Sequence, residues 1–166
     1  MVEAQIGLDG VVLNGYPISE AIPPHRLHEV LGPPDRIVDP APPAPFGHRN
    51  NQIHVYDSLG LYFNEHHSTR LTEDLVFVLW AEEEGYEFSP CRSFSGCLRL
   101  GGYRIPIEAG ESEVIRDCPI PFQKVLSGSW RAKGERFEVG MDTMGAKMKS
   151  GRRSSRRRVV SIDVSW

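Results

Sequence analysis

The chain has 166 residues, of which 40% are hydrophobic and 25% are charged, and its net charge at neutral pH is −3. These values are typical of an ordinary globular domain. We therefore expect a single β-rich domain over residues 1–166. A chain of this length buries enough surface to fold without a metal ion or disulfides.

The first residues, MVEAQIGLDG, contain no basic region followed by an apolar run, and no later stretch approaches the length of a membrane span. We therefore expect a cytoplasmic protein without membrane contact. Three cysteines, Cys91, Cys97 and Cys118, have no C-x-x-C spacing. This pattern favours reduced, buried thiols over a disulfide framework, a redox centre or a zinc site.

The N-terminal third predicts a hairpin followed by a helix. Ile6–Leu13 contains an Asp9-Gly10 pair, which is typical of a tight turn between two strands. In the segment IPPHRLHEVLGPP, prolines suit the first helical turn, and Leu27, Val30 and Leu31 share one face. Gly32 and the prolines after it then end the helix.

The rest of the chain predicts strands. A proline-rich surface loop at 39–51 precedes a hairpin at 53–63, an apolar strand at 75–80 for the centre of the sheet, and a hairpin at 97–107. The segment 111–116 has room for one helical turn. Strands are expected near 130–141 and at 159–166, with a basic loop at 147–158. The fold class is therefore α+β, mainly antiparallel sheet made of consecutive hairpins, with one short helix near the N-terminus.

Six histidines raise the question of a metal site. His66 and His67 are adjacent, so on a strand they point to opposite faces and cannot hold one ion together. His25 and His28 share a helix face, but no carboxylate or thiol with ligand spacing lies nearby. The sequence therefore predicts neither a metal site nor a cofactor.

Motifs for catalysis and phosphate binding are absent. The sequence has no G-x-S-x-G nucleophile turn, no G-x-x-x-x-G-K-[ST] loop and no G-x-G-x-x-G after a predicted strand. This favours a non-enzymatic protein. An enzyme of unfamiliar type, with its catalytic residues brought together only in space, remains the alternative.

A run of arginines near the C-terminus suggests contact with nucleic-acid phosphates through Arg152, Arg153, Arg156, Arg157 and Arg158. The competing interpretation is a solvated loop before the last strand. Aromatic residues for base stacking are absent from 141–164, and the whole chain is acidic. The sequence therefore favours the loop, with a nucleic-acid-contacting accessory protein as the alternative function.

An acidic segment follows the predicted strand that ends at Trp80. It combines carboxylates with an aromatic residue, namely Glu82, Glu83, Glu84, Tyr86 and Glu87. Such a segment complements a basic surface on another protein, with the aromatic side chains as anchors. The alternative is a charged turn with buried aromatic side chains.

Three segments of the chain combine leucine with turn-forming residues, namely Leu13-Asn14-Gly15, the helix stop Leu31-Gly32-Pro33-Pro34, and Tyr56-Asp57-Ser58-Leu59-Gly60. They resemble segments of a family of small bacterial domains found among immunity proteins of polymorphic toxins and type VI secretion effectors. The segment 94–102 also resembles the middle hairpin of that family. These motifs are structural, because glycines and prolines in them form turns and end a helix.

The resemblance implies an immunity protein that occludes a cognate toxin acting in the cytoplasm. A rigid sheet surface or loop covers the active site of the toxin, and charge complementarity selects the partner. The expected contacts are the acidic segment described above and the proline-rich loop with Phe46, His48 and Arg49.

Overall fold

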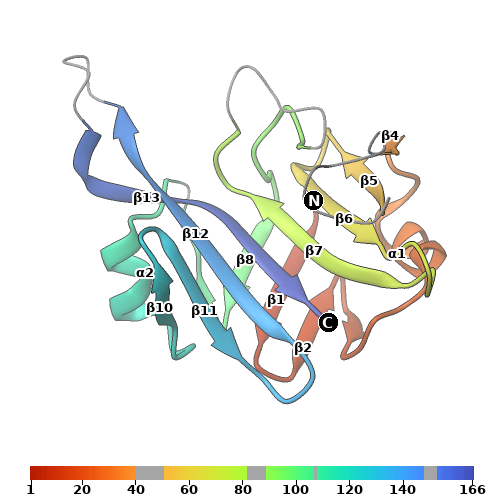
Figure 1. The fold of residues 1–166 in the computed structure, drawn as a ribbon, viewed down its shortest axis with the longest axis horizontal. Helices are drawn as coiled ribbons and strands as arrows, with labels where there is room; N and C mark the ends of the chain where they lie inside the picture. Colours follow the sequence, from red (N-terminus) through yellow and green to blue (C-terminus); the bar gives the residue numbers. More distant parts are fainter. Residues whose placement is uncertain (40–50, 82–88, 107, 148–152) are drawn as a thin grey trace.

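The structure is a computed structural model that describes residues 1–39, 51–81, 89–106, 108–147 and 153–166 (Figure 1). For residues 146, 147 and 153–156 it describes the backbone alone. Within these ranges the chain forms a five-stranded sheet, an eight-stranded sheet and two short helices. The predicted α+β class with mainly antiparallel sheet is confirmed.

The smaller sheet has the strand order β3-β2-β1-β8-β9. Its strands are β1 (Glu3–Gly7), β2 (Gly10–Leu13), β3 (Tyr16–Ile18), β8 (Cys97–Leu100) and β9 (Tyr103–Arg104). The predicted hairpin is confirmed, because β1 and β2 pair antiparallel around the Asp9-Gly10 turn. In contrast, β1 pairs with β8 in parallel, so this sheet is not made of consecutive hairpins alone.

The larger sheet is antiparallel throughout and has the order β10-β11-β12-β13-β7-β6-β5-β4. Its strands are β4 (Arg36–Val38), β5 (Gln52–Tyr56), β6 (Leu61–Glu65), β7 (Thr72–Val78), β10 (Gln123–Leu126), β11 (Ser129–Lys133), β12 (Glu138–Lys147) and β13 (Arg153–Ser165). The apolar strand predicted at 75–80 corresponds to β7, which lies inside the sheet as expected.

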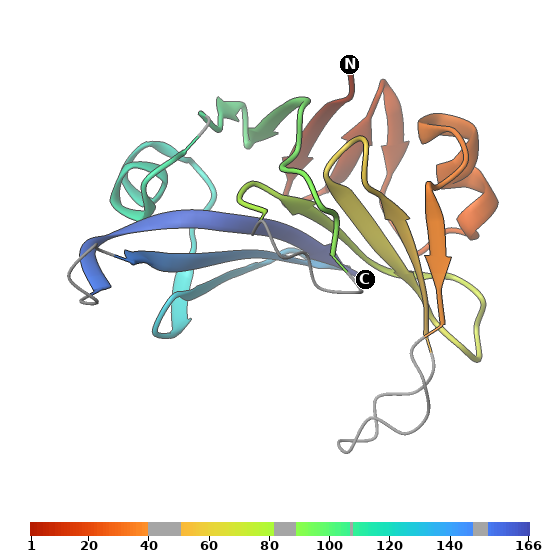
Figure 2. The same cartoon turned by 90° about the horizontal axis from the view of Figure 1, so that it is seen from above.

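The smaller sheet and both helices lie on the same side of the larger sheet (Figure 2). Side chains from the two sheets meet in one core, which includes the fully buried Ile6, Leu13, Phe63, Phe77 and Ile162. We call the opposite side of the larger sheet the outer face. No described helix or strand of the smaller sheet covers the outer face.

Both helices follow from local sequence. Helix α1 (Pro24–Leu31) has Pro24 in its first turn and ends at Gly32, whose φ of 86° favours glycine. Its apolar face is anchored by the fully buried Leu27. Helix α2 (Glu111–Asp117) is longer than the single turn that the sequence predicted, and it buries Val114.

The structure corrects the basic loop expected at 147–158. Strand β12 continues to Lys147 and β13 begins at Arg153, so residues 153–158 belong to a strand. Cross-strand pairs such as Gly145 with Arg157 hold this extension together. Apolar periodicity did not reveal this extension, because the hairpin projects beyond the core (Figure 1), where an apolar side chain at every second position is not needed.

The expectation of three buried thiols is wrong for Cys91. All three cysteines are free, but Cys118 is buried, Cys97 is partly buried and Cys91 is exposed. Cys91 lies in the connection between β7 and β8, where its backbone N–H donates to the Asp57 carboxylate. Among the described residues, neither helix has the length and apolar composition needed to cross a bilayer.

A buried polar chain ties α1 to the larger sheet. His28 Nε2 lies 3.1 Å from His54 Nδ1, and His54 Nε2 lies 3.0 Å from the carboxylate of Glu65. Arg70 reaches the other oxygen of Glu65 at 2.6 Å. The His54 ring also stacks on Phe63, with ring centroids 4.4 Å apart. A neutral His54 satisfies both neighbours, because Nε2–H donates to the carboxylate and Nδ1 accepts from His28.

Burial lowers the pKa of His54 below its usual range, although the hydrogen bond to Glu65 acts in the opposite direction. Burial also lowers the pKa of His28, and the neighbouring His54 adds to this effect. Both groups therefore bind protons more readily in the unfolded chain than in the folded one. The stability that they contribute is present above the unfolded pKa of about 6.5 and is lost as pH falls below it.

We predict that the free energy of unfolding falls by about 1 kcal/mol or more between pH 7 and pH 5.5, because one proton taken up on unfolding contributes up to about 1.4 kcal/mol per pH unit. Urea titrations at both pH values measure this. The variant His28→Gln should show a weaker pH dependence, whereas His67→Gln, at an exposed position, should retain it. Equal pH dependence in both variants would show that His28 is not coupled to folding.

Candidate interaction surface

The partner-binding residues predicted from sequence lie outside the described residues. This holds for Glu82, Glu83, Glu84, Tyr86 and Glu87, and also for Phe46, His48 and Arg49. The residues that flank the acidic segment are described, and Ala81 and Ser89 both line a hollow on the outer face.

This hollow has a volume of about 190 Å³. Its apolar lining comes from Tyr62, Val76, Val78, Trp80 and Met144. The side chains of Trp80 and Met144 are 42% and 46% exposed, and the guanidinium of Arg158 lies 4.8 Å from the centre of the Trp80 ring. An indole and a thioether at the surface are suitable anchors for a protein partner.

A larger hollow, of about 590 Å³, lies over β10 and β11 at the edge of the sheet. Val125 and Leu126 on β10 are 59% and 70% exposed beside it. Arg131 and Glu138 also line this hollow. Exposed apolar side chains therefore lie at two hollows of the outer face, and the charged Arg131 and Glu138 belong to the polar region between these apolar side chains.

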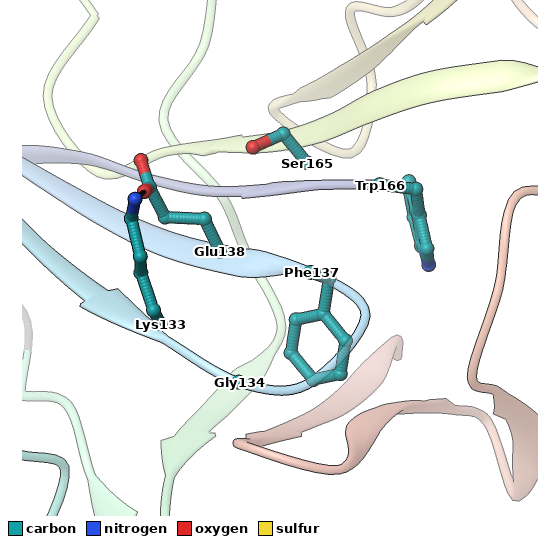
Figure 3. Close-up of a pocket in the computed structure, with 6 residues that line it drawn as sticks. All are labelled: Lys133, Gly134, Phe137, Glu138, Ser165 and Trp166. Atoms are coloured by element: carbon teal, nitrogen blue, oxygen red, sulfur yellow. Dashed lines mark ion pairs between the residues drawn. The ribbon is translucent and has the colours of Figure 1, made fainter.

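A third hollow, of about 320 Å³, lies where the β11–β12 turn meets the end of β13 (Figure 3). Lys133 and Glu138 point toward each other across it, with 4.0 Å between the amino nitrogen and the carboxylate. The ring of Phe137 and the indole of Trp166 form its apolar side. The Trp166 indole N–H is buried without a hydrogen-bond acceptor among the described residues.

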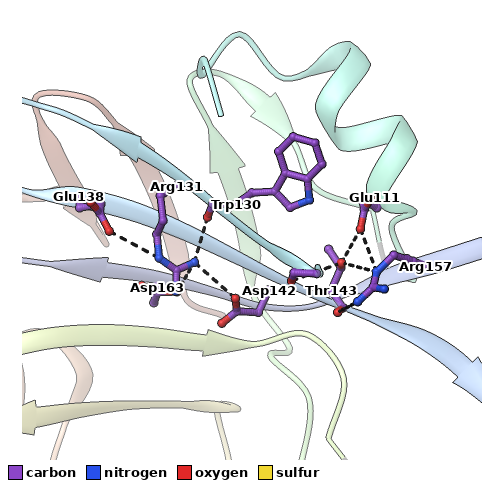
Figure 4. A network of polar contacts seen from close by, with 9 residues as sticks. Glu111, Trp130, Arg131, Glu138, Asp142, Thr143, Arg157 and Asp163 are labelled. Carbon is purple, nitrogen blue, oxygen red and sulfur yellow. Dashed lines mark hydrogen bonds and ion pairs between the residues drawn. The ribbon is translucent and has the colours of Figure 1, made fainter. Parts of the chain in front are cut away.

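Arg131 is the centre of the polar region (Figure 4). Its guanidinium lies 3.5 Å from Glu138, 3.3 Å from Asp142 and 4.0 Å from Asp163. The strand register brings these groups together, because Gly140 pairs with Arg131 on one side and with Asp163 on the other. A Cβ atom at Gly140 would lie 2.3 Å from the Asp163 carboxylate, so glycine provides the space for this arrangement.

Carboxylates outnumber cations in this region. Asp74 on β7 adds a fourth carboxylate and accepts hydrogen bonds from the backbone and side-chain N–H groups of Asn64. Burial raises the pKa of Asp74. Burial also raises the pKa of Asp163 to about 6, against the effect of Arg131 and with the repulsion of the neighbouring carboxylates. Burial and the repulsion of the neighbouring carboxylates also raise the pKa of Tyr62 to about 12.

We call this group the carboxylate cluster, defined as Glu138, Asp142 and Asp163 around Arg131 together with Asp74, whose charge acts on Asp163. The sequence analysis did not single out any of its members. On β12 and β13 these residues alternate with the buried Val139, Met141, Ile162 and Val164. Alternation of this kind is typical of any solvated sheet face, so only the strand order reveals that the acidic positions converge.

The structure places two of the arginines proposed for nucleic acid in intramolecular contacts. Arg157 donates to the hydroxyl and carbonyl oxygens of Thr143 and lies 3.1 Å from Glu111 (Figure 4). Arg158 lies over Trp80 and 3.4 Å from Glu108. Arg152 lies outside the described residues, and only the backbone is described for Arg153 and Arg156. These contacts reduce the number of arginines that remain for phosphates.

The histidines considered as metal ligands are separated. His66 lies in the turn after β6, where its Nδ1 accepts from the backbone N–H groups of Ser68 and Thr69. His25 is exposed on α1, whereas His28 belongs to the buried chain with His54. In the part of the chain that the structure describes, no three His, Cys, Asp or Glu side chains are grouped to hold a metal ion.

Comparison with protein families gives a match to DUF7738, a domain of unknown function, over residues 5–113. The chain belongs to the DUF7738 family. No curated protein and no solved structure matches it. The region matched to DUF7738 includes most of the smaller sheet and β4 to β7, with Tyr62, Asp74 and Trp80 of the outer face. Arg131, Glu138, Asp142 and Asp163 follow the matched region.

Arg157 fixes the projecting hairpin and α2 to the turn between β10 and β11. Gly128 in this turn has a φ of 89°, and a Cβ atom there would lie 2.0 Å from the Arg157 guanidinium and 2.6 Å from the Thr143 carbonyl oxygen. Gly102 has a similar φ of 91° with no atom within 4 Å of a Cβ atom. Substitution of Gly128 by alanine therefore adds a steric clash to backbone strain, whereas substitution of Gly102 adds backbone strain alone.

We predict that Gly128→Ala lowers the free energy of unfolding by about 2–4 kcal/mol, because it combines backbone strain with a clash. Gly102→Ala should cost about 1 kcal/mol, since it adds strain alone. Denaturant titrations of both variants measure the difference. Equal losses of unfolding free energy in the two variants would show that the Arg157 side chain moves aside without an energetic cost.

Proposed function

We propose that this chain is a non-enzymatic immunity protein, which binds a cognate toxin through the outer face of its larger sheet and occludes the active site of that toxin. The observation that supports this proposal is the composition of the outer face. It presents the exposed Trp80 and Met144 at one hollow and Val125 and Leu126 at another, with the carboxylate cluster between them.

The architecture suits inhibition by a rigid surface. The larger sheet is backed by the core on one side, so its outer face binds a partner with little loss of conformational entropy. Large apolar side chains supply the anchors, whereas charged groups around them set specificity and the rate of association. The resemblance of the turn and helix-stop segments to immunity domains supplies the class of partner.

The test begins with affinity capture of the tagged chain from its source cells, at low and high salt and with nuclease treatment. A captured protein counts as the cognate toxin only if its expression alone stops growth and co-expression of this chain restores it at a one-to-one ratio. Growth arrest that persists at excess of this chain would contradict the proposal. Capture of nucleic acid alone, lost at high salt, would favour the arginine-rich hairpin instead.

Within that assay, the double variant Trp80→Ala/Met144→Ala should weaken toxin binding about 30-fold or more, since one buried aromatic anchor alone contributes about 2 kcal/mol or more. The control is Val12→Ala/Tyr16→Ala, which removes two exposed apolar side chains from the smaller sheet. Calorimetry measures both affinities, and thermal unfolding checks that both variants fold. Equal loss of affinity in the two variants would contradict binding of the toxin through the outer face.

A further inference from the structure

The outer face also indicates what kind of partner segment it accepts. The carboxylate cluster lies between the two hollows that contain Trp80 and Leu126. Ser161 lines the smaller hollow and pairs directly with Asp142, and Glu138 lines the larger one. A partner that covers this face therefore contacts apolar surface and carboxylates together.

Arg131 does not saturate the carboxylates around it. Its guanidinium is shared among three of them at 3.3 to 4.0 Å, whereas Arg36 approaches Asp57 at 2.7 Å. Lys133 is 83% exposed and lies 4.0 Å from Glu138, so it adds little compensation. The side chain of Asp142 is 41% exposed and that of Asp163 is 20% exposed, and each carboxylate has oxygen lone pairs for a further donor.

We infer that the outer face binds an extended, cationic segment of a partner protein, with a lysine or arginine against Asp142 and Asp163 and an apolar residue in the hollow beside Trp80. This inference rests on the proposed function, since it names the chemistry of the surface that the toxin presents. Charge complementarity selects this occupant, because the carboxylates outnumber the cations at the centre of the face.

A protein segment fits the face better than a free cation does. Alternate side chains of an extended segment point to the same side, so a cationic residue and an apolar residue two positions away reach the carboxylates and the hollow together. A small cation would leave Trp80 and Met144 exposed. Charge-assisted hydrogen bonds to carboxylates are about twice as strong as neutral ones, which favours arginine or lysine over a neutral polar residue.

Binding of a cation at this position is coupled to protonation. The carboxyl group of Asp163 faces Arg131, Asp142, Asp74, Glu138 and Tyr62, and burial holds its pKa at about 6 in the free protein. A cation beside it favours the ionised form and so lowers that pKa on binding. The affinity is therefore full above about pH 7 and falls as pH decreases through 6, by at most about tenfold per pH unit for one proton.

The experiment titrates the isotope-labelled protein with the blocked peptide Leu-Ser-Arg-Ser-Leu, followed by NMR. The matched peptide Leu-Ser-Glu-Ser-Leu and calcium chloride serve as separate probes. We expect the arginine peptide to shift the Trp80 indole signal and the amide signals of Asp142 and Asp163, and to bind several-fold more weakly at pH 5.5 than at pH 7.5. The glutamate peptide and calcium should produce no such shifts.

The variant Asp142→Asn/Asp163→Asn should weaken binding of the arginine peptide about tenfold and remove its pH dependence, since it removes both carboxylates that pair with the peptide arginine. The control Glu3→Gln/Glu20→Gln makes the same change in net charge at exposed positions of the smaller-sheet side, and it should bind within twofold of the original protein. Equal binding of both peptides, no binding of the arginine peptide, or unchanged binding by the Asp variant would overturn the inference, as would the same shifts with calcium alone.

The outcomes separate this inference from the proposed function. If this chain neutralises a toxin and Asp142→Asn/Asp163→Asn protects cells equally well, the immunity role stands and the cationic contact is refuted. If the arginine peptide binds with the expected pH dependence but no captured protein is a toxin that this chain neutralises, the cationic contact stands and the immunity role is refuted.

Discussion

Strand β13 lies between β12 and β7 in the larger sheet. Its pairing joins the C-terminal strands to β4 through β7 in one sheet. Its alternating side chains then divide the molecule, because Ile162 and Val164 enter the core while Asp163 lies on the outer face. A shift of one residue in the pairing of β13 would move Ile162 and Val164 to the outer face and place the carboxylate of Asp163 in the core. The apolar core therefore fixes the register that assembles the carboxylate cluster.

Much of the local structure was predictable from sequence. Turn residues located the β1–β2 hairpin, and apolar spacing with terminal prolines and Gly32 located α1. The parallel pairing of β1 with β8 was not predictable, because its partners are far apart in sequence and no turn connects them. The projecting part of the β12–β13 hairpin was also missed, since backbone pairing without a buried face leaves no apolar pattern. The candidate surface was the least predictable part, because Asp74, Asp142 and Asp163 become neighbours only through the strand order.

Charge is used in two different ways on the two faces of the larger sheet. Arg157 is enclosed by Thr143, Glu111 and the Gly128 turn, so its charge holds α2 and the hairpin in place. Arg131 is surrounded by more carboxylates than it can neutralise, and the region remains electronegative. The run of arginines near the C-terminus is thus partly structural, whereas the acidic residues, which form no run in the sequence, converge on the outer face.

The parallel pair of β1 and β8 has a consequence for how the chain folds. Until the chain has been synthesised as far as Leu100, β1 has a partner on one side alone, and its other edge exposes unpaired backbone groups. Closing the long segment between Glu3 and Cys97 costs entropy before any contact compensates for it, so folding should be slow for a chain of this size. During that interval the free edge of β1 is open to pairing with other unfolded chains, which is a route to aggregation.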